Sequence, residues 1–114
     1  MAEILRDQHD LVLKLSTTEK VEGVHGDLRV PVSAVTSVTV VDDVIHAVSG
    51  LKVIGSSLPG VFKMGTFASG SETTFAIVHH QQKRGLRVNL MSGPFTTWII
   101  GLDNPETVLE NLGL

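Results

Sequence analysis

Apolar and polar residues alternate with a period of two along most of this chain. The clearest case is Leu86, Val88 and Leu90, which are separated by Arg87 and Asn89. Successive side chains of a strand point to opposite faces, so this alternation predicts a β-strand with one buried face. The same pattern predicts strands within residues 11–16, 28–33, 37–40, 62–64, 74–79 and 97–100. We therefore expect about seven strands, unless Pro31 joins the second and third into one bent strand.

Two short helices are expected between the strands. Ser16 and Glu19 have the spacing of a capping box, which predicts a helix of about two turns. Asp42 or Asp43 precedes a second short stretch, residues 44–48, and either carboxylate is suited to cap it. Helices of this length do not hold together alone in water, so both must be stabilised by the sheet.

The final segment predicts an amphipathic C-terminal helix. Asn104 is suited to cap the free N–H groups, and Pro105 falls at the first helical position, where its missing donor has no cost. Val108, Leu109 and Leu112 fall on one face of this helix. Because a short helix needs a partner surface, we expect this face to dock on the β-structure.

The connections between strands are expected to be short. Glycine and serine mark tight turns at 69–71 and 92–94 and a loop at 55–60. Gly65 interrupts the alternation of its strand and indicates a bulge or a close backbone approach. Only residues 42–60 offer a connection long enough for a parallel crossover, so we expect antiparallel pairing throughout.

Length and pattern together predict one domain, residues 1–114, that is mainly β with a C-terminal helix. We expect residues 1–9 to be a loose N-terminal segment. Five short motifs then carry a resemblance, at residues 25–31, 37–43, 58–61, 64–67 and 103–106. They resemble the small single-domain pleckstrin-homology-like (PH-like) proteins of actinobacteria, from roughly Leu11 to the end of the chain.

This resemblance implies a PH-like barrel or bent sandwich of antiparallel strands capped by one helix. It also implies binding or assembly rather than catalysis. It does not extend to phosphoinositide recognition, because the segment after the first strand carries Glu19, Lys20 and Glu22 in place of a basic cluster.

The amino-acid composition limits the class of protein, its chemistry and its cellular location. A hydrophobic content of 42% and a charged content of 18% are typical of a folded protein. The chain has no cysteine, which excludes disulfides, a thiol nucleophile and thiolate-bound metal. No basic and apolar leader pattern and no apolar run near ~20 residues occurs, so we expect a cytoplasmic protein. A net charge of −3 argues against nucleic acid as a partner.

The five histidines do not have the spacing of a metal site. His79 and His80 are neighbours on a predicted strand, where their side chains would point to opposite faces. If they lie in a turn instead, a third ligand is still missing. We therefore expect no metal and no cofactor.

Catalytic residues are not expected either. No serine stands in a GxSxG elbow, and Val61 occupies the place after Gly60 where a phosphate loop carries lysine. A third hypothesis is a small enzyme whose site is formed by Asp43, His46 and the 55–60 loop. An aspartate that caps a helix explains the Asp43 and His46 pair more simply.

The one concentrated basic patch consists of Lys83, Arg84 and Arg87, preceded by His79 and His80. These five residues are the candidates for binding an anion, an anionic membrane surface or an acidic protein. The alternative is a solvated turn between two apolar strands.

Trp98 is expected in the core. Its neighbours Ile99 and Ile100 are also large and apolar, so both faces of this strand need cover. Cover from a second subunit would make a homo-oligomer. The leading hypothesis is therefore a non-catalytic module that binds a protein partner or itself through an edge strand. The alternative is weak binding to anionic lipid.

Overall fold

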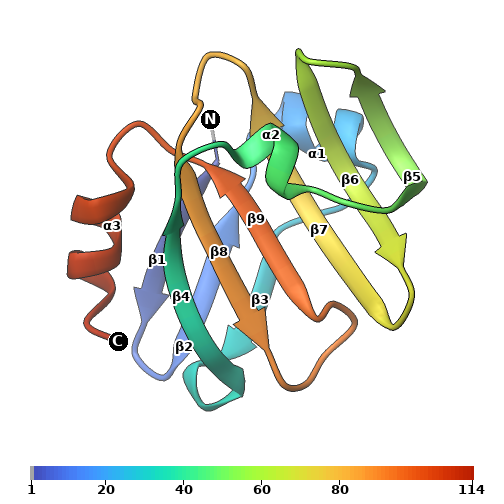
Figure 1. Ribbon diagram of the computed structural model, residues 1–114. Helices are drawn as coiled ribbons and strands as arrows, with labels where there is room; N and C mark the ends of the chain where they lie inside the picture. Colours follow the sequence, from blue (N-terminus) through green and yellow to red (C-terminus); the bar gives the residue numbers. More distant parts are fainter. Residues whose placement is uncertain (1) are drawn as a thin grey trace.

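The structure, a computed structural model, describes residues 2–114 (Figure 1). The strands are β1 (Glu3–Asp7), β2 (Asp10–Lys14), β3 (Leu28–Pro31), β4 (Val35–Val41), β5 (Leu51–Leu58), β6 (Phe62–Ser69), β7 (Glu72–His79), β8 (Gly85–Leu90) and β9 (Thr97–Gly101). The helices are α1 (Thr17–Gly23), α2 (Val44–Ala47) and α3 (Pro105–Leu112), with a 3-10 turn η1 at Val32–Ala34.

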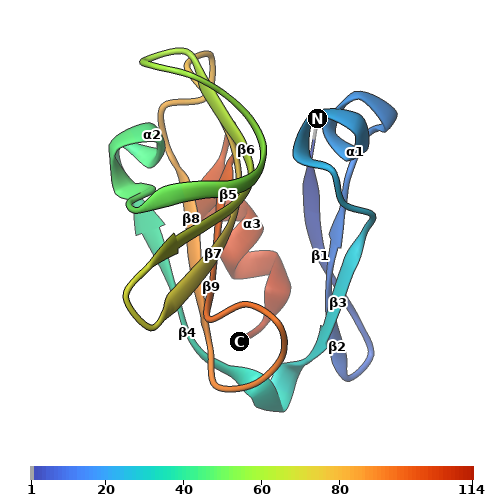
Figure 2. The ribbon, with the colours of Figure 1, turned by 90° about the vertical axis from the view of Figure 1, so that its right-hand side faces the viewer.

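The strands form two facing sheets. One has three strands in the order β1-β2-β3, and the other has six in the order β4-β8-β9-β7-β6-β5. Figure 2 shows the two sheets side by side, with α3 between them, where the helix contacts β1, β4 and β8. The predicted mainly β, bent sandwich with a C-terminal helix is confirmed, and the sheets do not close into a barrel.

One pair of strands departs from the antiparallel pairing that we expected throughout. β7 and β9 run parallel, with Thr74 opposite Thr97 and Ile77 opposite Ile100. The loop after β7 leads to β8 two strand positions away, and the hairpin from β8 then places β9 in the vacant position between them. A parallel pair therefore forms without the long crossover that our argument required.

Two strands were not expected, which raises the number in the described chain from about seven to nine. Within residues 1–9, β1 is paired with β2 along its whole length, and Met1 lies outside the described residues. Gly55 and Leu58, placed in a loop at 55–60, belong to β5 and pair with β6. A sheet neighbour here overrides the weak strand preference of glycine and serine.

The main core lies between the two sheets. Trp98, Leu86 and Ile100 point into it from the six-stranded sheet and meet Leu11 and Leu13 from the other sheet. Trp98 is buried, as predicted. Burial of side chains of this size supplies most of the free energy that holds the sheets together.

A second apolar cluster covers the opposite face of β9. Val44 and Ile45 of α2 pack there on Ile99, Val78 and Phe67. Both faces of β9 are therefore buried within one chain, so Ile99 does not need cover from a second subunit. α3 docks on the β-structure, as expected, where Leu112, Val108 and Leu109 join the main core.

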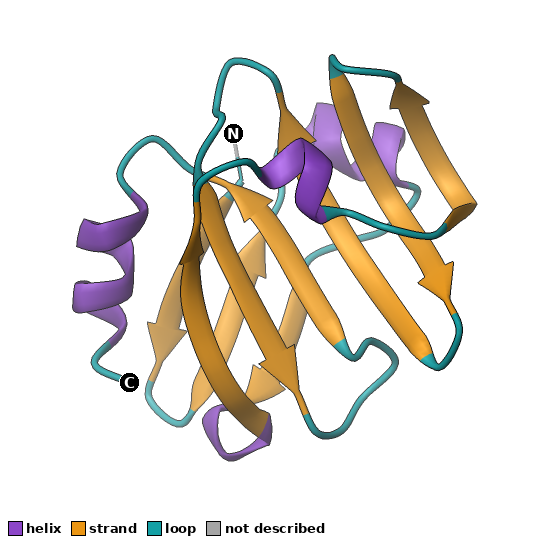
Figure 3. Cartoon of the chain, in the orientation of Figure 1, coloured by secondary structure: helices purple, strands orange, loops and turns teal. Residues whose placement is uncertain are grey.

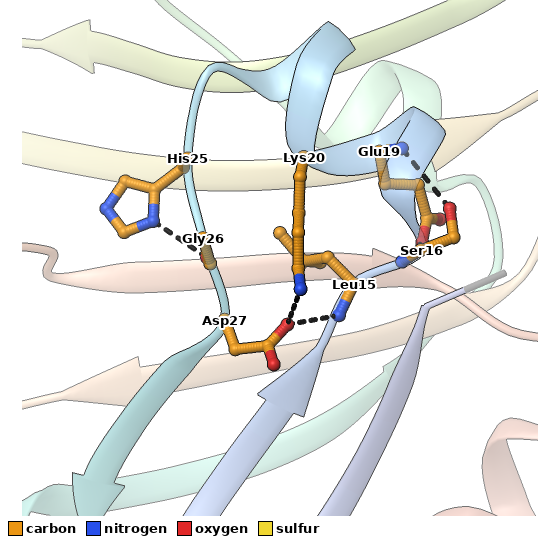
Figure 4. A network of polar contacts seen from close by, with 7 residues as sticks. All are labelled: Leu15, Ser16, Glu19, Lys20, His25, Gly26 and Asp27. Carbon is orange, nitrogen blue, oxygen red and sulfur yellow. Dashed lines mark hydrogen bonds and ion pairs between the residues drawn. The ribbon is translucent and has the colours of Figure 1, made fainter.

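The capping box of α1 is confirmed. Ser16 Oγ accepts from the Glu19 backbone N–H at 3.2 Å, and Glu19 Oε1 accepts from the Ser16 N–H at 2.8 Å (Figure 4). Asp27 Oδ1 accepts from the Leu15 N–H at 2.8 Å and lies 3.6 Å from Lys20 Nζ. The hydrogen bond from the Leu15 N–H is the main reason that the pKa of Asp27 is lowered. These bonds tie both ends of the α1 segment to the three-stranded sheet.

The other two helix starts differ from each other. Asp43 caps α2, as expected, through an Oδ1 that accepts from the His46 N–H at 3.4 Å. Pro105 begins α3, as expected, but the Asn104 side chain makes no capping bond, so that part of the prediction is wrong. The first turn of α3 is held instead by an ion pair of Glu106 with Arg84.

Candidate functional site

The two neighbouring histidines lie together at the end of β7. His79 is the last residue of the strand and His80 begins the turn, and their ring centroids are 4.5 Å apart. The opposite orientations that we expected are therefore wrong, because the strand ends between them. The His79 ring also stacks on Phe62, with centroids 6.2 Å apart. Within residues 2–114, no group of three histidine, cysteine or acidic side chains is placed to hold a metal ion.

Arg84 is tied into the fold. Its guanidinium donates to both carboxylate oxygens of Glu106, one of them at 3.1 Å, and to Asp42 Oδ1 at 3.3 Å. The hydrogen bonds from Arg84 lower the pKa of Glu106, and those to Glu106 and then Asp42 raise the pKa of Arg84. Arg84 thus joins the β7–β8 loop to α3 and to the end of β4.

The remaining basic residues of the patch are separated. Arg87 lies on β8, where its Nε donates to Asn89 Oδ1 at 3.1 Å and its Nη2 lies 3.6 Å from Glu72 Oε1. Lys83 is exposed and makes no ion pair among residues 2–114. The structure therefore brings His79 and His80 together but divides the arginines among different acidic partners. This pairing reduces the positive charge that an anion would meet.

A polar hollow beside His79 was missed by the sequence reasoning. It has a volume of about 390 Å³ and is lined by Glu19, Met64, His79, Gln81, Gln82 and Asp103. Gln82 Nε2 donates to Asp103 Oδ1 at 3.3 Å, and His79 Nδ1 accepts from the Gln81 N–H at 3.3 Å. These groups come from four separate parts of the chain, so no local motif could have indicated the hollow.

The Asp43 and His46 pair lies on the surface. His46 Nδ1 is 2.7 Å from Asp43 Oδ2, and the His46 side chain is 80% exposed. The hydrogen bond to His46 is the main cause that lowers the pKa of Asp43. The chain at 55–58, which the enzyme hypothesis placed beside this pair, is a strand rather than a loop. The arrangement explains the pair as a helix cap.

A larger groove runs beside the free edge of β4. It has a volume of about 570 Å³, and its walls come from β4, the end of α3 and Arg6. The Arg6 guanidinium is already occupied there, because Nη1 donates to the Leu112 and Gly113 carbonyls at 3.3 and 3.1 Å. Docking of α3 thus covers part of this sheet edge.

The edge formed by β5 is different. β5 is the last strand of the six-stranded sheet, and β6 is its one neighbour among the described residues (Figure 3). Large apolar side chains are exposed along it, with exposed fractions of 82% for Leu51, 64% for Val53, 48% for Ile54 and 51% for Leu58. An unpaired, apolar edge strand is a template for a further strand. Its sequence signal was the set of apolar residues Leu51, Val53 and Ile54, which Lys52 interrupts and which glycines and serines surround.

Within residues 2–114, no helix is long and apolar enough to cross a membrane. Comparison of the chain with family models, with curated proteins and with solved structures gave no match.

Proposed function

We propose that this protein is a non-catalytic binding module, which takes a strand from a protein partner or a second copy onto the free edge of β5. The observation that carries the proposal is the concentration of exposed apolar side chains on β5, which pairs with β6 on one edge and leaves its other edge free among the described residues. Main-chain hydrogen bonds would supply affinity, and contacts with Ile54 and Leu58 would supply preference for apolar partners. The PH-like resemblance, which implies binding or assembly, remains a prediction and agrees with this role. The cytoplasmic location also remains a prediction.

Weak binding to an anionic membrane through His79, His80, Lys83, Arg84 and Arg87 has less support. The ion pairs of Arg84 with Glu106 and of Arg87 with Glu72 already occupy two of the three strong bases. Lys83 alone offers little attraction at physiological salt.

Strand addition can be tested with peptides displayed as a library of extended sequences and selected against the purified protein. Bound peptides should slow hydrogen exchange of the β5 amides, because a new strand occupies their free edge. An Ile54→Lys variant should lose this protection, whereas Met91→Lys, which changes an exposed residue outside β5, should keep it. Protection that is absent, or unchanged in Ile54→Lys, would reject β5 as the binding edge.

A further inference from the structure

We infer that the strand added to β5 is β5 of a second copy, paired antiparallel about a two-fold axis that passes through the sheet at Ser56. The inference rests on the proposed strand addition and names its partner. It would join two six-stranded sheets into one continuous sheet.

The segment 54–58 of β5 keeps one continuous register with β6, with Gly55 at a φ of +134°. The register with β6 shifts between Lys52 and Ile54, so the residues before this bulge do not continue the same ladder. Directly opposite residues in an antiparallel ladder share a face. Ile54, Ser56 and Leu58 therefore lie on one face, since they are opposite Thr66, Met64 and Phe62. This is the face on which Met64 packs against the main core.

When two copies of the segment 54–58 pair antiparallel, apolar residues lie opposite apolar residues and small residues lie opposite small ones. With the axis at Ser56, Ile54 lies opposite the partner's Leu58, and Leu58 lies opposite the partner's Ile54. Both side chains are about half exposed in the single chain, so each pair gains apolar burial on both copies. On the other face Gly55 lies opposite the partner's Ser57, so only small groups meet. A shift of the axis to Gly55 would place Ile54 opposite the partner's Ser56.

Charge does not oppose this pairing. Lys52 is the one charged residue of β5, and it lies before the bulge, outside the paired segment. Lys63 on the neighbouring strand is held by the Val48 carbonyl, to which its Nζ donates at 3.1 Å. No charged side chain of β5 therefore lies within the 54–58 segment, and this segment has no group of its own to select an acidic or basic partner.

The contact is small. Five residues span about 17 Å along the edge, and a strip of this length buries on the order of 300 Å² on each copy, below a standard stable interface. We therefore expect the dimer to be weak and to form only at high protein concentration. The bulge and Lys52 limit the length of the paired segment. Bulges and lysines commonly limit pairing at edge strands in this way.

Sedimentation velocity over about 10 µM to 2 mM measures this equilibrium directly. The protein should shift from monomer to dimer across this range. Ile54→Lys should remain monomeric, because it places a charge opposite the partner's Leu58, while Met91→Lys should behave like the parent. Addition of Leu58→Glu to Ile54→Lys should restore the dimer, since each new lysine then faces a glutamate of the other copy. Circular dichroism and Trp98 fluorescence show that each variant is folded.

A cysteine at the axis tests the register. The chain has no cysteine, so Ser56→Cys introduces a single thiol. Opposite residues of an antiparallel pair have Cα atoms about 4.5–5.5 Å apart, which a disulfide can bridge. Ser56→Cys should form a linked dimer under mild oxidation at least about tenfold faster than Ser57→Cys, which lies opposite the partner's Gly55, and Ser92→Cys on an exposed turn.

Either of two results would overturn the second copy as the partner. The first is a protein that stays monomeric at 2 mM, with Ser56→Cys cross-linking no faster than Ser92→Cys. The second is a dimer that Ile54→Lys leaves intact. If selected peptides still protect the β5 amides in either case, strand addition stands and the partner is another protein.

Discussion

Single glycines set how closely neighbouring strands of the six-stranded sheet approach. Gly85 at the start of β8 lies opposite Gly101 at the end of β9. A Cβ atom at Gly85 would lie 1.9 Å from the Ile100 carbonyl oxygen and 2.9 Å from Gly101 Cα. Backbone atoms cannot move aside as a side chain can, so this position tolerates no larger residue.

Replacement of Gly85 by alanine should therefore destabilise the protein by about 2–4 kcal/mol, the range of a severe steric conflict in a core. Gly26→Ala is the matched control, because a Cβ atom there meets nothing within 4 Å. It should be neutral or stabilising by up to about 1 kcal/mol. Urea unfolding followed by Trp98 fluorescence measures both. Equal stabilities of the two variants would contradict the close approach at Gly85.

At the scale of elements, helix caps show where local sequence rules succeed. Ser16 and Glu19 make both bonds of the capping box, because both groups lie within four residues of each other. Asn104 has an equally favourable residue type, yet its side chain makes no cap bond, and Glu106 in the same turn is drawn to Arg84. The partner of Glu106 is 22 residues away, so local rules do not include it.

These two caps should respond differently to alanine. Ser16→Ala should lower the free energy of unfolding by about 1 kcal/mol, the typical value for loss of an N-cap bond. Asn104→Ala should change it by less than about 0.5 kcal/mol, as at an ordinary surface position. Chemical denaturation of the two variants compares them directly. A loss at Asn104 as large as that at Ser16 would show that Asn104 caps α3 in solution.

Strands in which apolar and polar residues alternate strictly could be predicted from the sequence. Strands that form only because a neighbouring strand pairs with them could not. Leu86, Val88 and Leu90 define β8 by pattern alone. The residues Gly55 to Leu58 have a loop composition and become a strand because β6 offers a ladder. The parallel position of β9 depends on where β8 leaves a vacancy, which no local pattern records.

At the scale of the molecule, the candidate site was only partly predictable for the same reason. The sequence identified the basic residues 79–87, but it could not show that Arg84 and Arg87 have acidic partners from other strands and from α3. It also could not show that β5 ends the sheet, because strand order is a property of the whole fold. Through these ion pairs, Arg84 links the β7–β8 loop to the end of β4 and to α3.

This link gives Arg84 a pH-dependent effect on stability. The folded-state pKa of Glu106 is lowered from its ordinary value of 4.5 by Arg84. A lowered carboxyl pKa stabilises the fold above pH 4.5, and this contribution is lost as the pH falls through the folded-state value. Arg84→Gln should therefore lower the midpoint of thermal unfolding by a few degrees at pH 7, and the difference from the parent should shrink steadily below pH 4.5.

Lys83→Gln is the control for this prediction, because it removes the same charge from an adjacent exposed residue that has no ion pair among residues 2–114. Its unfolding midpoint should stay close to that of the parent at every pH, as expected for an unpaired surface charge. Thermal unfolding followed by circular dichroism between pH 3 and 8 measures both variants. If Arg84→Gln and Lys83→Gln were equally stable at pH 7, the bridge between the β7–β8 loop and α3 would not contribute to the stability of the fold.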